Sequence, residues 1–203
     1  MNLAKEIKQS GKNVALADLD IVNPYFRAKD SEAELKKLGI HLICSEYANT
    51  NLDIPALPDE LYAITDQTDK YFVLDIGGDD RGAYVLGRIA PKITEERNFD
   101  CFAVVNMFRP LSKDAESSVT ILHEIEYAGG INFTGVINNS NLGESTTKDD
   151  ILSSFNYSKE IALKKHIPVA FTTVNKKLKK EFSELEVKEY NLKFMELQDK
   201  PFL

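Results

Sequence analysis

The stretch YFVLDIGGDDRGAYVLGR, residues Tyr71–Arg88, decides the predicted fold of this chain. An apolar run, Phe72–Leu74, ends at Asp75 and is followed by two glycines and a sequence that can form a helix. Open α/β sheets bind ligands at the carboxyl ends of their strands. We therefore expect Asp75 to face a metal–phosphate group and Gly78 to begin a mobile loop. The alternative is that Asp75 caps the next helix and that the glycines only turn the chain.

Strand-like and helix-like segments alternate along the whole chain. Strands are predicted at residues 14–17, 40–44, 72–74, 101–107, 133–137 and 169–173. Helices are predicted at residues 2–10, 31–38, 59–66, 114–128, 148–165 and 176–186, and after the glycines that follow Asp75. The strands are continuously apolar, which is typical of a parallel sheet covered by helices on both faces. The pattern predicts one three-layer, doubly wound α/β domain over residues 1–203.

The composition narrows the class of protein. Of the 203 residues, 43% are hydrophobic and 28% are charged, which fits a folded globular chain. A net charge of −7 argues against nonspecific binding of nucleic acid. No apolar run approaches the roughly 18 residues of a membrane span, and the N-terminus lacks a signal-peptide core, so we expect a cytoplasmic protein. Cys44 and Cys101 lie far apart in apolar runs, which favours buried free thiols.

Three carboxylates end or follow predicted strands: Asp18, Asp20 and Asp75. The carboxyl ends of parallel strands lie along one edge of a sheet, so these side chains should share one side of the molecule with Asn138 and Asn139. Carboxylates gathered there with little neutralising charge need a cation or shifted pKa values. Mg²⁺ prefers oxygen ligands and commonly binds through one or two carboxylates together with phosphates and waters. This chemistry of Mg²⁺ fits Asp18, Asp20 and Asp75 better than that of zinc or iron would.

At these positions the sequence resembles a known family. The segments AKEIKQSGKNVALADLD, LDIGGDD and TGVINN resemble the first helix with the second strand, the switch II segment and the adenine-reading strand of the deviant P-loop ATPases of the MinD, ParA and nitrogenase-iron-protein superfamily. DLDIVNPYFR together with DIGGDD is most similar to the CobQ/CobB/MinD/ParA nucleotide-binding domains. The resemblance covers nearly the whole chain and implies a P-loop NTPase-like fold.

The resemblance also implies roles for individual residues in binding ATP and Mg²⁺. Asp18 would lie in the inner layer near the metal, and Asp20 would activate the attacking water. Asp75 would bind a water ligand of Mg²⁺, and the Gly78 amide would sense the γ-phosphate. The adenine would be read by Asn139, with Asn138 as the second choice, and Pro168 would line the base pocket. Proteins of this family dimerise with ATP and bind a client protein, so a homodimer and an unknown client are implied.

One part of the family pattern is missing. The phosphate loop, G-x-x-x-x-G-K-[ST], occurs nowhere in the 203 residues, and a helix without a preceding strand opens the chain. That loop supplies the amides and the lysine that hold the phosphates, so we expect slow ATP hydrolysis or none. On this interpretation the chain is a shortened gene product or a degenerate homologue.

Two other interpretations stay open. A non-catalytic interaction module derived from such an ATPase would keep the partner surface without the switch. A Rossmann dinucleotide domain also places an acidic residue at the end of its second strand, but its GxGxxG motif is absent too.

Overall fold

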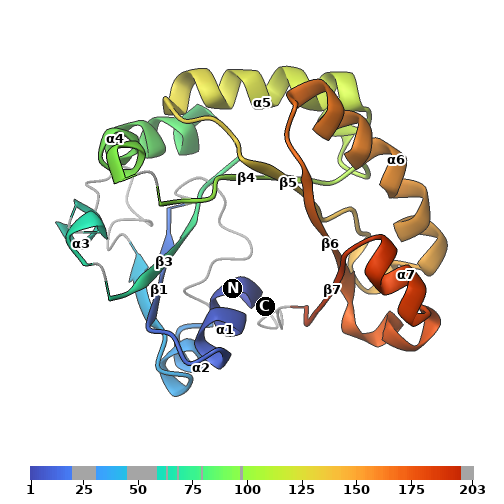
Figure 1. Ribbon diagram of the computed structural model, residues 1–203, viewed down its shortest axis with the longest axis horizontal. Helices are drawn as coiled ribbons and strands as arrows, with labels where there is room; N and C mark the ends of the chain where they lie inside the picture. Colours follow the sequence, from blue (N-terminus) through green and yellow to red (C-terminus); the bar gives the residue numbers. More distant parts are fainter. Residues whose placement is uncertain are drawn as a thin grey trace. The chain divides into compact units, whose positions relative to one another are not determined.

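The computed structural model describes residues 1–19, 31–44, 59–62, 64–67, 69–78, 80–96 and 98–197. It contains two parallel sheets flanked by helices (Figure 1), which confirms the predicted α/β class. The described residues divide into two compact units, those within 1–99 together with 128–130, and those within 100–127 and 131–197. We describe each unit by itself, and the single domain expected from the sequence stays a prediction.

The first unit is built on a three-stranded parallel sheet in the order β2-β1-β3. Its strands are β1 (Val14–Asp18), β2 (His41–Cys44) and β3 (Tyr71–Asp75). Its helical elements are α1 (Asn2–Gln9), α2 (Glu32–Lys37), α3 (Asp59–Tyr62), η2 (Ile64–Asp66) and α4 (Asp80–Glu96). Side chains of α1 and α2, among them Ala4 and Leu35, pack with Val14 and Leu16 of β1 in one apolar cluster. One face of this sheet is therefore covered by α1 and α2.

The second unit is built on a four-stranded parallel sheet in the order β4-β5-β6-β7. Its strands are β4 (Phe102–Val105), β5 (Gly135–Asn138), β6 (Val169–Asn175) and β7 (Leu192–Met195). Its helices are η3 (Pro110–Ser112), α5 (Ala115–Gly129), η4 (Gly143–Ser145), α6 (Lys148–Lys165), η5 (Lys176–Glu181) and α7 (Glu184–Glu189). Each strand pairs in parallel with its neighbour, as the continuously apolar strands predict.

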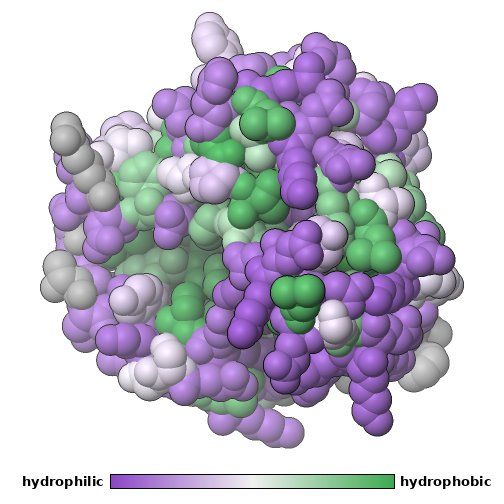
Figure 2. All heavy atoms as spheres, turned by 45° about the vertical axis from the view of Figure 1, so that its right-hand side comes forward, coloured by the Kyte–Doolittle hydropathy of each residue, from purple (hydrophilic) through white to green (hydrophobic). Residues whose placement is uncertain are grey.

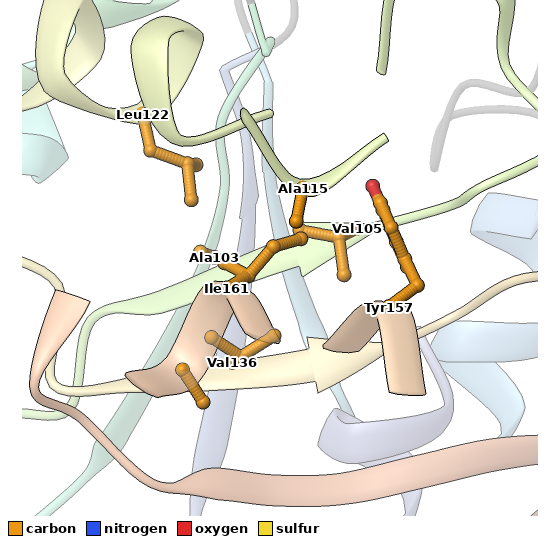
Figure 3. Packing of buried hydrophobic residues seen from close by; sticks show 8 residues of the cluster. Ala103, Val105, Ala115, Leu122, Val136, Tyr157 and Ile161 are labelled. Carbon is orange, nitrogen blue, oxygen red and sulfur yellow. The ribbon is translucent and has the colours of Figure 1, made fainter. Parts of the chain in front are cut away.

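The core of the second unit lies between β4, β5 and the helices α5 and α6 (Figure 3). Ala103 and Val136 come from the strands, Leu122 comes from α5, and Ile161 comes from α6. Tyr157 packs in the same cluster, and its hydroxyl donates to the Ser112 carbonyl over 2.8 Å. Burial is the main reason that the pKa of Tyr157 is raised. The hydroxyl group therefore stays neutral and hydrogen-bonded inside the core.

The end of the chain differs from the sequence-based prediction. Residues 176–186 do not form one helix, because η5 ends at Glu181 and α7 begins at Glu184. Between them Phe182 turns into the core beside Val174, and Ser183 caps α7 with its side chain. The strand at 169–173 is not the last one, since β7 follows α7. The prediction failed because this lysine-rich segment contains no Pro or Gly, and so no signal that ends a helix. In the structure, burial of the Phe182 ring interrupts the helix.

One smaller boundary also differs. The segment predicted as one helix at 59–66 is divided into α3 and η2. Helix α4 continues through Pro91 to Glu96, and the Thr94 hydroxyl donates to the Ala90 carbonyl over 2.9 Å in this region. A proline removes one helical donor, so helices usually end or kink there. Packing of the α4 face that carries Val85, Leu86 and Ile89 outweighs this cost.

Helix α7 carries a titratable cap that makes stability depend on acid pH. The Glu186 carboxylate accepts from the Ser183 amide over 2.7 Å and from Lys148 Nζ over 2.7 Å. The Lys148 hydrogen bond, followed by those of Ser183, lowers the pKa of Glu186 from 4.5 to about 2. A lowered folded-state pKa means that the stabilisation is complete above the unfolded value and is lost as the pH falls through the folded value.

We therefore expect the Glu186→Gln variant to lose less stability than the parent chain between about pH 4.5 and pH 2, because its cap cannot be protonated. Urea unfolding at a series of pH values in this window measures the difference. Glu189→Gln, at the exposed end of the same helix, is the control and should keep the parental pH dependence. If the free energy of unfolding fell equally steeply with decreasing pH in both variants, the assignment of Glu186 would be contradicted.

Candidate functional site

Asp18 and Asp75 stand side by side at the carboxyl ends of adjacent strands. In the parallel ladder of β1 and β3, Asp18 is the register partner of Asp75. The Leu19 amide donates to the Asp75 carbonyl over 2.8 Å, which continues the pairing past the last strand residue. Neighbouring strands lie about 4.8 Å apart, and paired residues point to the same face of the sheet. The structure thus brings together two of the predicted metal-binding carboxylates.

The start of α1 lies at the same end of the sheet. Because side chains alternate along a strand, Asp18 shares the face of Val14 and Leu16, which α1 and α2 cover. Burial lowers the pKa of the Met1 amino group, while the carboxylates of Asp75 and Asp18 act in the opposite direction. Both carboxylates are therefore within electrostatic range of the first residue before α1. A helix N-terminus presents unsatisfied N–H groups, so this corner offers oxygen ligands for a cation next to donors for an anion.

The turn after Asp75 is held by close packing of glycines. Gly77 is buried, whereas Gly78 is exposed and has open space where a Cβ atom would be. Gly82, in the first turn of α4, lies so close to Gly77 that a Cβ atom on Gly82 would be 2.1 Å from the Gly77 carbonyl oxygen. The position of the turn is therefore set by backbone contact with α4. The predicted sensor, Gly78, sits at its accessible end.

Asp20, the predicted water-activating residue, lies outside the described residues, so its role stays a prediction. Within the described ranges, no group of three or more His, Cys, Asp and Glu side chains could hold a metal ion. Two carboxylates are nevertheless enough for Mg²⁺, which keeps waters and takes substrate phosphates as further ligands. The donor set of Asp18 and Asp75 fits that ion better than zinc, which prefers nitrogen and sulfur ligands.

In the second unit, a network of amides and hydroxyls occupies the carboxyl ends of β4, β5 and β6. The Asn106 carboxamide oxygen accepts from the Phe108 amide over 3.0 Å, and its nitrogen donates to the Asn141 carbonyl over 3.3 Å. The Ser140 hydroxyl accepts from the Met107 amide over 3.0 Å. These bonds tie the loop after β4 to the loop after β5. The loops after β4 and β5 are therefore fixed to each other at the strand ends where Asn138 and Asn139 lie.

The two asparagines predicted to read adenine have different environments. Asn138 is fully buried; its side-chain nitrogen donates to the Ser154 hydroxyl over 2.8 Å, and its oxygen accepts from the Ser140 amide over 3.2 Å. Asn139 is half-buried, and its side-chain oxygen accepts from the Thr173 hydroxyl over 2.5 Å. Its side-chain nitrogen has no acceptor among the residues that the structure describes. Asn138 is thus used in packing, and Asn139 is the better candidate for a ligand contact.

Pro168 does not lie with Asn139. Pro168 precedes β6, and its carbonyl accepts from the amide of Val136, near the start of β5, over 2.8 Å. Asn139 follows the end of β5, three residues further along an extended strand, which corresponds to roughly 10 Å. The structure therefore places the two residues at opposite ends of the strands of the same sheet and does not bring them together.

Two residues of these sites were not predicted from the sequence. The close contact of Gly82 with Gly77 had one available signal, a glycine in the first turn of a helix, where a better helix former would be expected. Ser154 holds the Asn138 side chain from the middle of α6. No signal marks Ser154, because a serine inside an amphipathic helix does not indicate which strand it faces.

The two cysteines are free, as predicted, and both are half-buried. Burial, with a smaller contribution from the Glu126 carboxylate, raises the pKa of the Cys101 thiol to about 11. A thiol with a raised pKa is a poor nucleophile at neutral pH. Cys101 is therefore a packing residue of the second unit.

Comparison with protein-family models gives no match, and comparison with curated proteins gives none either. In the described part of the chain, no helix has the length and apolar character needed to cross a bilayer.

Proposed function

We propose that this chain is the nucleotide-binding domain of a switch protein of the MinD and ParA type, which binds ATP with Mg²⁺ and regulates a partner protein. The observation that carries the proposal is the register pairing of Asp18 with Asp75 beside the start of α1. Oxygen ligands next to a helix N-terminus suit a divalent cation together with a phosphate. Neither a homodimer nor a client is needed for this step, and both remain implied by the resemblance.

On this proposal the first unit holds the metal and the terminal phosphate. The carboxylates of Asp18 and Asp75 hold Mg²⁺, directly or through its waters, and Asp20 positions the attacking water. The Gly78 amide contacts the terminal phosphate, and the open side of the glycine leaves room for that approach. A base contact of Asn139, whose side-chain oxygen is held by Thr173 within the second unit, stays what the resemblance implies. Mg²⁺ supplies charge neutralisation on the phosphates.

The missing phosphate loop sets the expected strength of this activity. Phosphoryl transfer depends on amides and a lysine that stabilise the charge on the transferred group, and the chain carries no such motif. We therefore propose that the chain binds Mg·ADP and Mg·ATP weakly and hydrolyses ATP slowly or not at all. An ATP turnover of about 1 s⁻¹ or faster, which is typical of kinases and related enzymes, would contradict this part of the proposal.

Titration calorimetry with ADP, with and without MgCl₂, tests the metal assignment. We expect Asp75→Asn to weaken Mg·ADP binding roughly tenfold, since one anionic ligand of the cation is lost, and to leave metal-free ADP binding unchanged. Asp69→Asn, an exposed change of the same kind in the same unit, should have no effect. Equal Mg·ADP affinity for the parent and the Asp75 variant would refute the role of Asp75.

The second candidate function is a non-catalytic interaction module derived from such an ATPase. The same titrations separate the two, because a module without a nucleotide site should bind neither ADP nor ATP up to about 1 mM.

A further inference from the structure

Helix α4 touches two other segments of the first unit through backbone atoms. Near the start of the helix, a Cβ atom on Gly82 would lie 2.1 Å from the Gly77 carbonyl oxygen. Further along, a Cβ atom on Gly87 would lie 3.1 Å from the Ala128 carbonyl oxygen. In both contacts a glycine meets backbone, so no side chain can rotate to absorb a displacement, and close-packed segments transmit it. The helix therefore joins the turn after Asp75 to the end of α5 without an adjustable side chain between them.

The end of α5 also approaches α4 through a glycine of its own. A Cβ atom on Gly129 would lie 3.3 Å from Leu86 Cδ2 and 3.6 Å from the Ala83 carbonyl oxygen. Ala83 and Leu86 are buried on α4. A residue without a Cβ atom allows this close approach of two backbones. The buried face of α4 thus holds the last residues of α5 in place.

The segment that α4 holds is a crossing point of the chain. Ala128–Gly130 belongs to the first unit, whereas residues 100–127 before it and 131–197 after it belong to the second. Gly130 has a φ of 63°, a left-handed conformation that glycine adopts without strain, and a Cβ atom there would meet nothing within 4 Å. Gly129 therefore serves close contact and Gly130 serves backbone conformation. Small residues at the end of an element are typical of a hinge.

The other end of α4 meets the proposed cation site. Gly77 is buried and in contact with Gly82, whereas Gly78 is exposed and has open space beside it. A cation and a phosphate bound at this turn would attract the Asp75 carboxylate and the Gly78 amide. A movement of the turn that displaces Gly77 has to displace the start of α4 as well.

We propose that α4 is a rigid connector that couples the ligand state of the turn at Asp75–Gly78 to the position of the hinge at Ala128–Gly130. The identity of the ligand rests on the proposed function, whereas the connector is a property of the fold. Coupling between two sites is reciprocal, so a change at the hinge should also be felt at the turn.

Amide chemical shifts measured by NMR without any ligand test the connector. We expect Gly82→Ala to shift the amides of Ala128 and Gly129 at least about threefold more than Gly78→Ala does, because only the first variant displaces α4. Equal shifts of these two amides in both variants would overturn the connector.

Gly87→Ala tests the connector from its other end and is the milder change, because the Ala128 carbonyl has to give by only a few tenths of an ångström. By reciprocity it should shift the amides of Gly77 and Gly78. Arg88→Ala, an exposed change at the next position of α4, is the control and should shift them at least about threefold less. If both variants move these amides equally, nearness along the helix is a sufficient explanation and the connector is refuted.

A fluorescent reporter tests the coupling to the ligand. The chain contains no tryptophan, and Tyr127, next to the hinge, is 92% exposed. The emission of Tyr127→Trp should change when MgCl₂ and ADP are added together. Leu163→Trp is the control reporter, because Leu163 lies on α6 and is 75% exposed. On the side of α6 and α7 that Figure 2 turns forward, hydrophobic atoms form only small patches among hydrophilic ones, and the emission of this control should not change.

Calorimetry on the same two variants separates this inference from the proposed function. Mg·ADP binding without an emission change of Tyr127→Trp would refute the connector and leave the proposed function standing. Equal emission changes of both variants would refute the connector too, since the response would not be specific to the hinge. Absence of Mg·ADP binding up to about 1 mM would refute the proposed function and, with it, the coupling of the connector to this ligand.

Discussion

Replacing Gly82 by alanine is expected to destabilise the first unit by about 2 kcal/mol, although alanine is the better helix former. The reason is steric. The added Cβ atom would lie 2.1 Å from the Gly77 carbonyl oxygen, which is backbone and cannot rotate away. Either α4 or the turn between Asp75 and Gly78 has to shift. Urea unfolding gives the free-energy change.

Gly78→Ala is the matched control for this prediction. It changes the same residue type in the same turn, but a Cβ atom at Gly78 meets nothing within 4 Å. We expect an effect within about 0.5 kcal/mol. A Gly82→Ala variant as stable as Gly78→Ala would show that the contact with Gly77 does not hold the turn.

The second large effect is expected at Lys165. Its ammonium group pairs with the Glu126 carboxylate, and the two side chains are only 6% and 12% exposed. Glu126 also accepts from the Phe133 amide over 3.0 Å. Lys165→Ala leaves this shielded carboxylate with only the exposed His123 ring, 3.6 Å away, and breaking a buried pair typically costs about 3 kcal/mol or more. Chemical unfolding of the variant at neutral pH measures the loss.

The adjacent residue supplies the control. Lys164 pairs with Glu116 over 2.7 Å, but its side chain is 39% exposed and that of Glu116 is 77% exposed. Exposed pairs contribute roughly 0–1 kcal/mol, so Lys164→Ala should be nearly neutral. The double variant Lys165→Met with Glu126→Gln should recover most of the stability, because it removes the unpaired charge and keeps the volume. Equal losses for Lys164→Ala and Lys165→Ala would contradict the buried pair.

The sequence predicted the parallel strands and the ends of most helices. The runs at 14–17 and 72–74 are apolar and stop at aspartates, so they marked β1 and β3 within one residue at each end. The helix at 148–165 was predicted without error, and in the structure Thr147 and Asp150 form a capping box at its start and lysines occupy its last turn. Near the C-terminal end the pattern failed, since packing of Phe182 against Phe194 divides the lysine-rich segment.

The candidate site could be predicted only in part. Asp18 and Asp75 were found because a carboxylate after an apolar strand is visible in the sequence, and their pairing follows from a parallel sheet. The choice between Asn138 and Asn139 needed the structure. Ser154, sixteen residues away on α6, holds the Asn138 side chain and makes it a packing residue. Pro168 was assigned to the base pocket by resemblance alone. In the structure it lies just before β6, at the opposite end of the strands from Asn139.

The sequence by itself determined the class of fold and the residues available for chemistry, because strand and helix periodicity and the residues at strand ends are local properties. Only the tertiary structure decided which of two neighbouring residues is shielded from solvent or in close contact with another segment. Lys164 and Lys165 share a local sequence, yet Lys164 is exposed, whereas Lys165 pairs with Glu126 and both of these side chains are largely shielded from solvent. Gly78 and Gly82 are likewise close in sequence, yet Gly78 has open space beside it and Gly82 is in close contact with Gly77. Burial and close contact depend on segments far apart in the chain, and single-residue patterns do not encode them.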